Sequence, residues 1–254
     1  MKKLIAVSVL VLAACGGGDD KPAANAAPTE KDFFAQGIYA GQVTDISGET
    51  LEMIAIVGAD GTVEAADTYY GNVHYGVLSS SGNEVTGSLR SFTAPGYYWE
   101  ANGEGVIDTS ISFTVSESDQ SVIGKTSYKG ITQSNFSLLS YPNYYNNPPS
   151  SFDEVAGTYN AYLYDSEVYL QITESGAVSG YDTTSCDYNG NLVQPIGDKN
   201  LYKLALKVSN CGEFNGSWEG KAFFILPPDQ RPLLALTAHS EKAGRAGVFN
   251  WVSQ

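Results

Sequence analysis

Short runs of apolar residues, many of them alternating with polar ones, fill the chain from residue 33 onward. These runs are rich in β-branched and aromatic residues, as in LEMIAIV (51–57), GVIDTSISFTV (105–115), LYKLALKV (201–208) and KAFFIL (221–226). Alternation of this kind is typical of strands with one buried face. Beyond residue 14, no apolar stripe with a period of about 3.6 residues continues for more than about two helical turns. The pattern therefore predicts an all-β fold.

Turn dipeptides separate the predicted strands at intervals of roughly 8 to 12 residues. The strongest pairs place Asn or Asp before Gly, because glycine accepts the positive φ that tight hairpin turns need. They are Asp60-Gly61, Asn102-Gly103, Asn189-Gly190 and Asn215-Gly216, with weaker pairs at Ser47-Gly48, Ser81-Gly82 and Ser175-Gly176. Most neighbouring strands are thus expected to form hairpins.

One segment without aliphatic residues, YPNYYNNPPS (141–150), interrupts the strand pattern. Its prolines and asparagines are typical of a linker between domains. We therefore predict a first β domain at 33–140 and a second at 151–254. Each half has room for about 7 to 9 short strands, which suits a small closed barrel or a sandwich.

The two halves share a faint internal likeness. Three pairs of segments resemble each other: GIYAGQVTD (37–45) and GTYNAYLYD (157–165), MIAIVGADGTV (53–63) and VYLQITESGAV (168–178), and GKTSY (124–128) and GKAFF (220–224). The spacing between these matches drifts along the chain. Internal duplication and two unrelated halves both stay open at this point.

A closed barrel removes the unpaired strand edges that a row of hairpins would otherwise expose to aggregation. The opening Gly37-x-Tyr39 strand, followed by successive hairpins, is similar to lipocalin and streptavidin-type barrels. It is also similar to the barrel halves of surface lipoproteins such as the transferrin-binding and factor H-binding types. This resemblance implies an up-and-down meander in each half, and no binding residue is carried over from it.

The first 14 residues read as an export signal. Lys2 and Lys3 precede an apolar core from Leu4 to Leu12, and small residues follow. The core is about half as long as the roughly 20 residues that span a bilayer, so it predicts a cleaved signal peptide at 1–14 rather than a membrane helix.

The segment Leu12-Ala13-Ala14-Cys15 resembles the lipobox of bacterial lipoproteins. The resemblance implies that the Cys15 thiol takes a diacylglyceryl group, that the signal is cut before Cys15, and that the new amino group is acylated, for example with palmitate. Several acyl chains give stable attachment to a lipid bilayer, whereas one anchors only marginally. Gly16 after the cysteine resembles enteric lipoproteins that are sent to the outer membrane. An ordinary secretory signal with a chance cysteine is the alternative.

The segment at 15–32 is expected to be a lipidated, flexible tether, because GGGDDKPAANAAP (16–28) holds no large apolar residue. The whole chain has 254 residues and a formal net charge of −14. Nucleic-acid binding begins with a basic patch, so we expect no nucleic-acid partner. Together these features predict a lipid-anchored protein of the bacterial cell envelope, facing either the periplasm or the cell surface.

Two cysteines remain once Cys15 is assigned to lipid. Cys186 and Cys211 form one even pair in an exported chain, where oxidation is the default, so we predict a structural disulfide between them. A redox or metal pair is the alternative, but it lacks CxxC spacing and a neighbouring histidine.

Catalytic motifs are absent from the sequence, which holds no HExxH, no GxSxG and no phosphate-binding loop of the Walker type. We expect His74 and His239, each in a strand-like segment, to be packed or solvent-facing rather than catalytic. Neighbouring acids, such as Glu117 with Asp119 or Asp182 with Asp187, arise by chance among 28 acidic residues. We therefore assign no catalytic residue and no cofactor.

A loop of oxygen-bearing residues at 187–198 partly resembles a calcium-binding loop. Leu192 stands where that loop needs glycine, and Pro195 interrupts it. A hairpin loop turned at Asn189-Gly190 is the favoured interpretation, and no metal site is predicted.

Tyrosine-rich clusters give the remaining indication of a contact surface. They are PGYYWE (95–100), DTYYGN (67–72) and YPNYYNN (141–147), all beside turn residues. Tyrosine and tryptophan offer large contact areas at low entropic cost. We select Tyr97, Tyr98, Trp99, Tyr144 and Tyr145 as candidate ligand-binding residues, with an ordinary strand and core role as the alternative.

Three functions remain open on the sequence alone. The first is a non-catalytic envelope lipoprotein that binds a protein or glycan of the envelope or of a host. The second is an accessory lipoprotein that scaffolds or chaperones another envelope component. The third is a periplasmic hydrolase that acts on glycans through a pair of carboxylates at fixed separation.

Overall fold

The computed structural model describes residues 33–67, 69–94, 96–163, 166–194, 199–227, 231–242 and 245–253. The predicted signal peptide at 1–14, the acylation site Cys15 and the tether lie outside the described residues. Residues Asp32–Gln254 form one compact unit.

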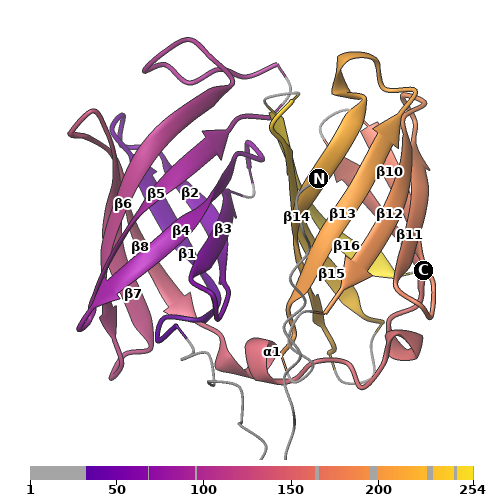
Figure 1. The fold of residues 1–254 in the computed structure, drawn as a ribbon, viewed down its shortest axis with the longest axis horizontal. Coiled ribbons are helices and arrows are strands. Elements are labelled where there is room, and N and C mark those ends of the chain that lie inside the picture. The colour runs from indigo at the N-terminus through magenta and orange to yellow at the C-terminus, as the bar shows by residue number, and fades with distance from the viewer. Residues whose placement is uncertain are drawn as a thin grey trace, which may run out of the picture. The chain divides into compact units, whose positions relative to one another are not determined.

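The first half of the unit is a closed barrel in which each strand pairs with its neighbours along the chain, antiparallel throughout (Figure 1). β1 also pairs with β8, for example Gly41 with Leu138, and this closes the ring. The strands are β1 (Gly37–Asp45), β2 (Thr50–Val57), β3 (Thr62–Asp67), β4 (Val73–Ser81), β5 (Glu84–Phe92), β6 (Val106–Ser116), β7 (Ser121–Tyr128) and β8 (Ile131–Ser140).

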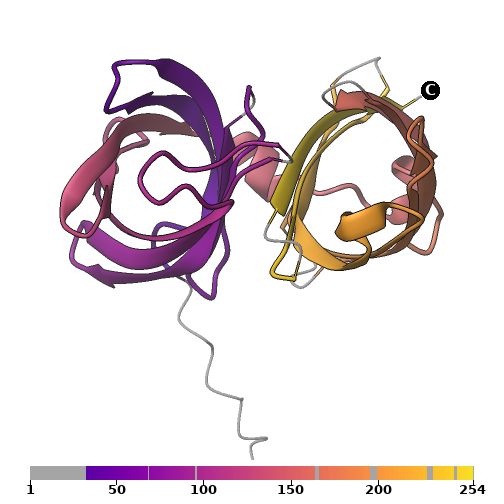
Figure 2. The same ribbon diagram turned by 90° about the horizontal axis from the view of Figure 1, so that it is seen from above.

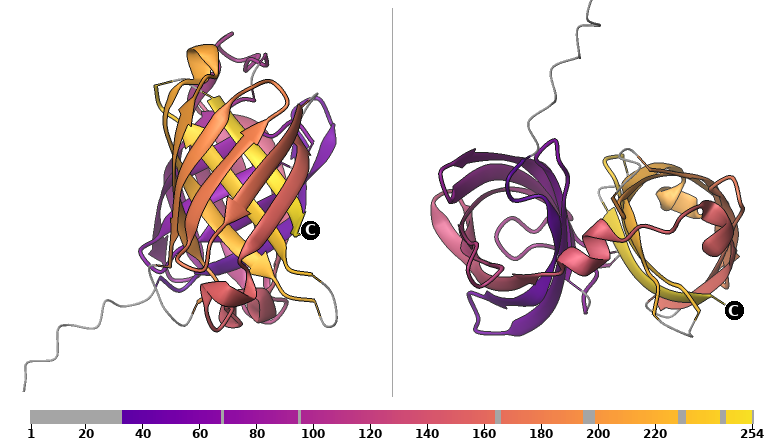
Figure 3. Two further views of the ribbon diagram at one scale, coloured as in Figure 1. Left: turned by 90° about the vertical axis from the view of Figure 1, so that its right-hand side faces the viewer. Right: turned by 90° about the horizontal axis from the view of Figure 1, so that it is seen from below.

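The second half repeats this architecture with another closed barrel of antiparallel strands. Its first strand pairs both with the next strand and with the last. The strands are β9 (Gly157–Leu163), β10 (Ser166–Ile172), β11 (Ala177–Asp182), β12 (Asp187–Val193), β13 (Tyr202–Ser209), β14 (Gly216–Ile225), β15 (Leu233–Ser240) and β16 (Arg245–Ser253). Both rings are visible end-on in Figure 2, and the left view of Figure 3 shows the oblique run of the strands. The predicted all-β class is confirmed, as barrels rather than sandwiches.

Short helical segments lie between the barrels and between strands of the second barrel. α1 (Pro142–Asn146) lies in the segment predicted as a linker, and single 3-10 turns occupy Phe152–Glu154 and Gly212–Phe214. The right view of Figure 3 shows the chain passing through α1 from the first ring to the second.

The hairpin predicted at Asn189-Gly190 is wrong, since both residues lie in the middle of β12. β12 pairs with β13, and Gly190 faces Leu206 in that register. A Cβ atom at Gly190 would collide with the carbonyl oxygen of Ala205. The glycine is therefore explained by the close approach of two strands, and the loop expected around it is a strand instead.

In both barrels, a buried tyrosine on the first strand makes the same hydrogen bond to the backbone that precedes the strand. The Tyr39 hydroxyl donates to the Ala35 carbonyl at 2.8 Å, and the Tyr159 hydroxyl donates to the Val155 carbonyl at 2.6 Å. In both cases the phenol reaches back four residues and fixes the chain that enters the barrel. Burial raises the pKa of Tyr39 to about 12, so the phenol stays protonated and donates.

Two of the three sequence likenesses fall on matching strands. Gly61 and Gly176 both occupy the turn between the second and third strands, with φ of 76° and 77°. The third likeness is wrong as a structural match. Residues 124–128 lie in β7, the seventh strand of its barrel, whereas 220–224 lie in β14, the sixth strand of the other. The matches that hold support equivalent folds in the two halves.

Buried aromatic side chains occupy the interior of the second barrel. Tyr159, Tyr202 and Phe224 are buried there, with Tyr202 and Phe224 in edge contact at 5.2 Å between ring centroids. Phe152 and Trp218 pack against the same cluster. The interior of the first barrel also holds aromatic residues, Phe113 and Phe136, but it leaves a cavity between its walls.

Outward-facing residues of the two barrels pack on each other within the compact unit. The apolar part of this contact consists of Ile38, Ile56, Tyr145, Leu201, Phe223 and Ala235. Beside it, His239 Nδ1 lies 3.1 Å from Glu64 Oε1, and both side chains are only 1% exposed. The His239 ring is stacked between Tyr75 and Phe92, with centroids 5.0 and 4.9 Å away. The barrels are therefore joined by a buried polar pair as well as by apolar packing.

Candidate functional site

The first barrel encloses a cavity of about 900 Å³. Its lower walls are apolar and come from every part of the ring, including Val57, Val63, Leu78, Phe136 and Leu138. Inward side chains of a closed barrel alternate with outward ones along each strand, so this lining follows from the alternating sequence pattern. The result is a hollow, largely apolar interior.

Small residues on β2 and β3 keep part of this interior open. Ala55 on β2 and Ala65 on β3 are paired directly, and both line the cavity. The likeness of 53–63 with 168–178 places Leu170 of the second barrel opposite Ala55. Leu170 is buried in the filled interior of that barrel. A larger side chain at the matching position thus contributes to filling the second barrel.

One end of the first barrel is closed by the chain that enters it. Phe33 packs against the apolar interior, and its backbone N donates to the Ala59 carbonyl. The Phe33 ring lies 3.5 Å from the place where Gly61 would carry a Cβ atom. Because neighbouring strands alternate in direction, the turns β1–β2, β3–β4, β5–β6 and β7–β8 all lie at the opposite end. That opposite end is called the mouth below.

A polar network runs across the wall of the cavity near the mouth. His74 on β4 lies with Nδ1 2.7 Å from Ser91 Oγ on β5, and Ser91 Oγ lies 3.3 Å from Thr109 Oγ1 on β6. All three residues line the cavity. Burial lowers the pKa of His74 to about 4, so the imidazole is neutral at pH 7. This part of the wall therefore holds neutral polar groups that bond to one another, and no positive charge.

The loop between β5 and β6 caps part of the mouth, and Figure 2 shows it lying across the ring of the first barrel. Trp99 fixes the loop, since its Nε1 donates to the Ser91 carbonyl at 3.2 Å. The Thr93 hydroxyl donates to the Tyr97 carbonyl at 2.8 Å and holds the start of the loop. The Trp99 ring lies 5.9 Å from the His74 ring, between their centroids. A tryptophan thus covers the polar network from above.

Tyrosines and acids surround the rest of the mouth. The Tyr70 hydroxyl donates to both carboxylate oxygens of Glu49, at 3.0 and 3.2 Å. Tyr70 and Tyr97 are in edge contact, with ring centroids 5.7 Å apart. Glu49, Tyr70 and Tyr97 all line the cavity together with Tyr98 and Tyr128. The mouth therefore combines aromatic faces with negative charge.

The candidate ligand-binding residues fall into two separate groups. Tyr97, Tyr98 and Trp99 line the cavity at its mouth. Tyr144 and Tyr145 lie on α1, away from it. Tyr145 is 4% exposed and its hydroxyl donates to Gln36 Oε1 at 3.0 Å, while Tyr144 stacks on Tyr141 at 5.6 Å between ring centroids. The structure brings together the first three and not the last two.

Further lining residues were not selected from the sequence. Tyr70 belongs to the tyrosine cluster at 67–72, which carried a signal but no assignment. His74 and Ser91 gave none, because a lone polar residue in a strand does not reveal which face it occupies. The apolar lining is likewise visible only when strands far apart in sequence are paired around the ring.

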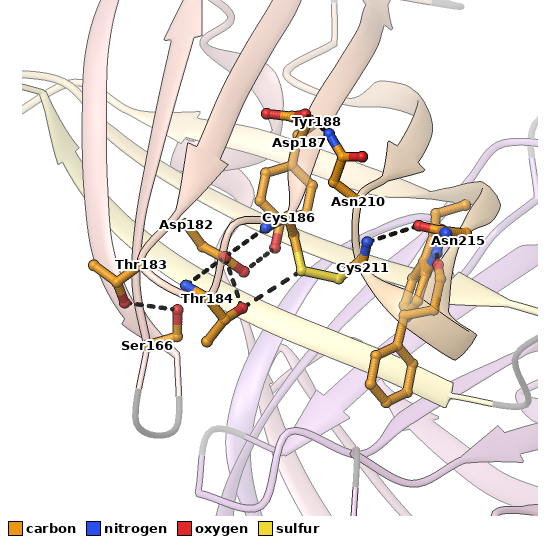
Figure 4. The surroundings of a disulfide bond; sticks show 12 residues. Ser166, Asp182, Thr183, Thr184, Cys186, Asp187, Tyr188, Asn210, Cys211 and Asn215 are labelled. Atoms are coloured by element: carbon orange, nitrogen blue, oxygen red, sulfur yellow. Dashed lines mark hydrogen bonds between the residues drawn. A yellow bond between two sulfur atoms is a disulfide. The ribbon is translucent and has the colours of Figure 1, made fainter.

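Cys186 and Cys211 are joined by a disulfide, which links the β11–β12 connection to the residues after β13 (Figure 4). Asp182 Oδ1 accepts hydrogen bonds from the backbone N of Thr184 at 2.9 Å and of Cys186 at 3.0 Å. The Tyr188 hydroxyl donates to Asp182 Oδ2 at 2.7 Å. These contacts indicate a structural bridge beside a tightly bonded turn.

Three of the four paired acids considered from the sequence accept local hydrogen bonds. Asp182 is engaged in the turn just described, and Asp187 accepts from the Asn210 side chain. Glu117 and Asp119 lie in the exposed β6–β7 turn, where Asp119 accepts from Ser116 Oγ at 2.9 Å. Among the described residues, no group of three His, Cys, Asp or Glu side chains lies close enough to hold a metal ion. Asp198 of the calcium-like segment lies outside those residues.

Comparison with known proteins gives little further guidance. No protein-family model matches the chain, and no curated protein matches it either. A crystal structure of a candidate outer membrane protein from Bacteroides fragilis is similar over 87% of this chain and 98% of its own, with 11% sequence identity and a TM-score of 0.31. This similarity is too low to assign a fold or a function. Within the described part of the chain, no helix has the length and apolar character needed to cross a membrane.

Proposed function

We propose that the chain is a lipid-anchored protein of the bacterial cell envelope whose first barrel binds a small, mainly apolar molecule without transforming it. The observation that carries this proposal is the cavity of about 900 Å³ in the first barrel. Ligand pockets of proteins span roughly 300 to 1,000 Å³ and are mostly apolar with a few placed polar groups. The cavity has both properties.

The contrast between the two barrels supports a binding role. Protein interiors are closely packed and keep few voids larger than a water molecule. The second barrel follows this rule with its buried aromatic residues, whereas the first retains a large hollow under a loop fixed by Trp99. A cavity lowers the stability of a protein. We therefore expect the cavity of the first barrel to be kept because it binds a ligand.

A non-catalytic role agrees with the state of the polar groups in the cavity. His74 and Ser91 are in hydrogen-bond contact, as a base and a nucleophile would be. However, Ser91 is 0% exposed, so its hydroxyl is covered by its neighbours and is not presented as a nucleophile in this structure. The low pKa of His74 also makes it a poor base near neutral pH.

The lipid anchor is proposed from the sequence Leu12-Ala13-Ala14-Cys15. It is tested by growing cells that express the chain with radiolabelled palmitate. We expect the label to enter the wild-type chain and to be absent from Cys15→Ser. Equal labelling of both chains, or labelling of neither, would contradict an anchor at Cys15. Digestion of intact cells with added protease then distinguishes a surface orientation from a periplasmic one.

The binding role is tested by native mass spectrometry of the chain isolated from its own envelope. We expect a fraction of the protein to carry one noncovalent adduct, which organic extraction releases and identifies. Ala65→Phe places an aromatic ring inside the cavity and should lower the fraction of protein that carries the adduct. If wild-type and Ala65→Phe proteins carry the same adduct in equal fractions, the bound molecule lies elsewhere and the proposal fails.

A further inference from the structure

We propose that the molecule bound by the first barrel is an amphiphile with a cationic head group, whose apolar tail lies in the cavity and whose head lies at the mouth. This inference rests on the proposed binding function. It adds the charge of the head group that the mouth of the first barrel prefers.

Charge around the cavity is strongly unbalanced. Its lining holds four acids, Asp45, Glu49, Asp67 and Glu100, but Lys129 is the single Lys or Arg among the described residues that line it. An anionic head group at the mouth would meet mostly like charges, whereas a cation would meet opposite ones. The lining therefore favours a positive head group.

Two of these acids, Asp45 and Asp67, accept hydrogen bonds from the backbone of their own turns. Asp67 Oδ1 accepts from the backbone N of Tyr70 at 2.6 Å, and its Oδ2 accepts from that of Asn72 at 3.1 Å. Asp45 Oδ1 accepts from the backbone N of Ser47 at 2.8 Å. Glu49 and Glu100 are the other two lining acids, and both are exposed.

Glu49 lies beside a cluster of tyrosine rings. Its carboxylate accepts the hydrogen bond of the Tyr70 hydroxyl, and Tyr69 and Tyr97 are in edge contact with the Tyr70 ring at 4.8 and 5.7 Å between centroids. Tyr98 is 61% exposed at the same mouth. Cations bind over the faces of aromatic rings, and quaternary ammonium groups are often recognised by several rings together. Rings and a carboxylate at one place are complementary to such a head group.

The deeper cavity has no charge that would draw a polar head inward. Its polar groups are uncharged: the neutral His74 with Ser91 and Thr109, and the hydroxyl pair of Thr126 and Ser134. Apolar side chains make up most of the rest of the lining. An apolar tail is thus the part of an amphiphile that fits below the Trp99 cap. The division between an apolar interior and an acidic, aromatic mouth sets the orientation of the ligand.

The test uses the segment 32–254, which contains all sixteen described strands and forms a compact unit of its own. Three probes with the same dodecyl tail are titrated below their micellar concentrations by calorimetry: dodecyltrimethylammonium, dodecyl maltoside and dodecyl sulfate. We expect dodecyltrimethylammonium to bind with an affinity about tenfold higher than dodecyl sulfate at low salt. The ratio should fall as salt is added, because exposed charges are screened.

A matched pair of variants separates the mouth from the overall negative charge of the chain. Glu49→Gln with Glu100→Gln removes two acids at the mouth, and Glu117→Gln with Asp119→Asn removes two acids at the other end of the same barrel. We expect the preference for the cation to fall several-fold only in the first variant. Tyr70→Leu should also reduce it, while dodecyl maltoside binding stays within about twofold. Thermal unfolding of each variant checks that the fold is kept.

The outcomes are distinct. Equal affinity for the three probes, a preference for dodecyl sulfate, or an equal loss of preference in both acid variants overturns the cationic head group and leaves the binding function standing. Failure of all three probes to bind the wild-type segment overturns the binding function and the inference with it.

Discussion

Ala55 and Ala65 are direct partners across β2 and β3, and both methyl groups border the cavity of the first barrel. They belong to a regular antiparallel ladder, and their small side chains leave space beside them. The second barrel has Leu170 at the position matched to Ala55, in the same buried cluster as Tyr202 and Phe224. One architecture thus gives a hollow barrel and a filled one.

Large side chains should therefore be tolerated differently in the two barrels. We expect Ala65→Phe to leave the free energy of unfolding unchanged or raised, because the ring enters an existing void. Ala222→Phe adds the same ring to the filled interior and should lower the free energy of unfolding by about 1 to 3 kcal/mol. Urea unfolding measures both values. Similar destabilisation by the two changes would mean that the first barrel is as tightly filled as the second.

Acidification should destabilise the chain through His74. Its pKa is about 4 in the fold, below the value of about 6.5 in the unfolded chain, so the unfolded state binds more protons between these values. The contribution of His74 to stability is complete above pH 6.5 and is lost as the pH falls through 4, by up to about 3 kcal/mol. Urea unfolding at a series of pH values follows this loss.

His74→Leu is the control for that experiment, since it removes the titrating group and keeps an apolar contact with the cavity. The difference in stability between wild type and variant should change across pH 6.5 to 4 in the direction given above. A difference that is constant across this range would show that His74 does not titrate with a lowered pKa.

The pair formed by Glu64 and His239 should be important for stability. Removing one partner of a buried polar pair leaves the other without compensation, and we expect Glu64→Ala to lower the free energy of unfolding by about 3 kcal/mol. Glu219→Ala is the matched control, because Glu219 lies 3.7 Å from the other nitrogen of His239 but its side chain is 70% exposed. Its effect should stay below about 1 kcal/mol. Thermal or urea unfolding distinguishes the two, and equal effects would contradict the role given to the buried pair.

The disulfide between Cys186 and Cys211 should stabilise the chain mainly by restricting its unfolded state. We expect the double variant Cys186→Ser with Cys211→Ser to lose about 3 kcal/mol of unfolding free energy. Reduction of the wild-type chain with dithiothreitol should give the same loss and should not change the double variant. A reductant effect on the double variant would indicate another cause.

The strands were predictable because their signals are local. Alternating apolar residues and turn pairs such as Ser47-Gly48 and Asp60-Gly61 depend on neighbours along the chain, and they lie in or between strands as expected. The hairpin prediction at Asn189-Gly190 was wrong because glycine is also suited to a strand where another backbone comes very close. The reason for Gly190 is the carbonyl of Ala205, which no local pattern reveals.

The cavity was less predictable than the strands, because it depends on contacts between residues that are far apart in the sequence. Tyr97, Tyr98 and Trp99 carried an aromatic signal and lie at the mouth, but Tyr144 and Tyr145 carried an equal one and lie on α1. Whether a barrel is hollow depends on the summed volumes of side chains from eight strands. His74, Ser91 and Thr109 come together only through the register of β4, β5 and β6.

The most direct test of the binding barrel is a fluorescence titration of segment 32–254 with the neutral apolar probe 1-N-phenylnaphthylamine. We predict saturable binding of one probe per chain, with an affinity that Ala65→Phe lowers because its ring occupies part of the cavity. Ala177→Phe places the same ring on an exposed position of β11 and should leave the titration unchanged. Binding that is absent from the wild type, or that persists undiminished in Ala65→Phe, would contradict a ligand site in the first barrel.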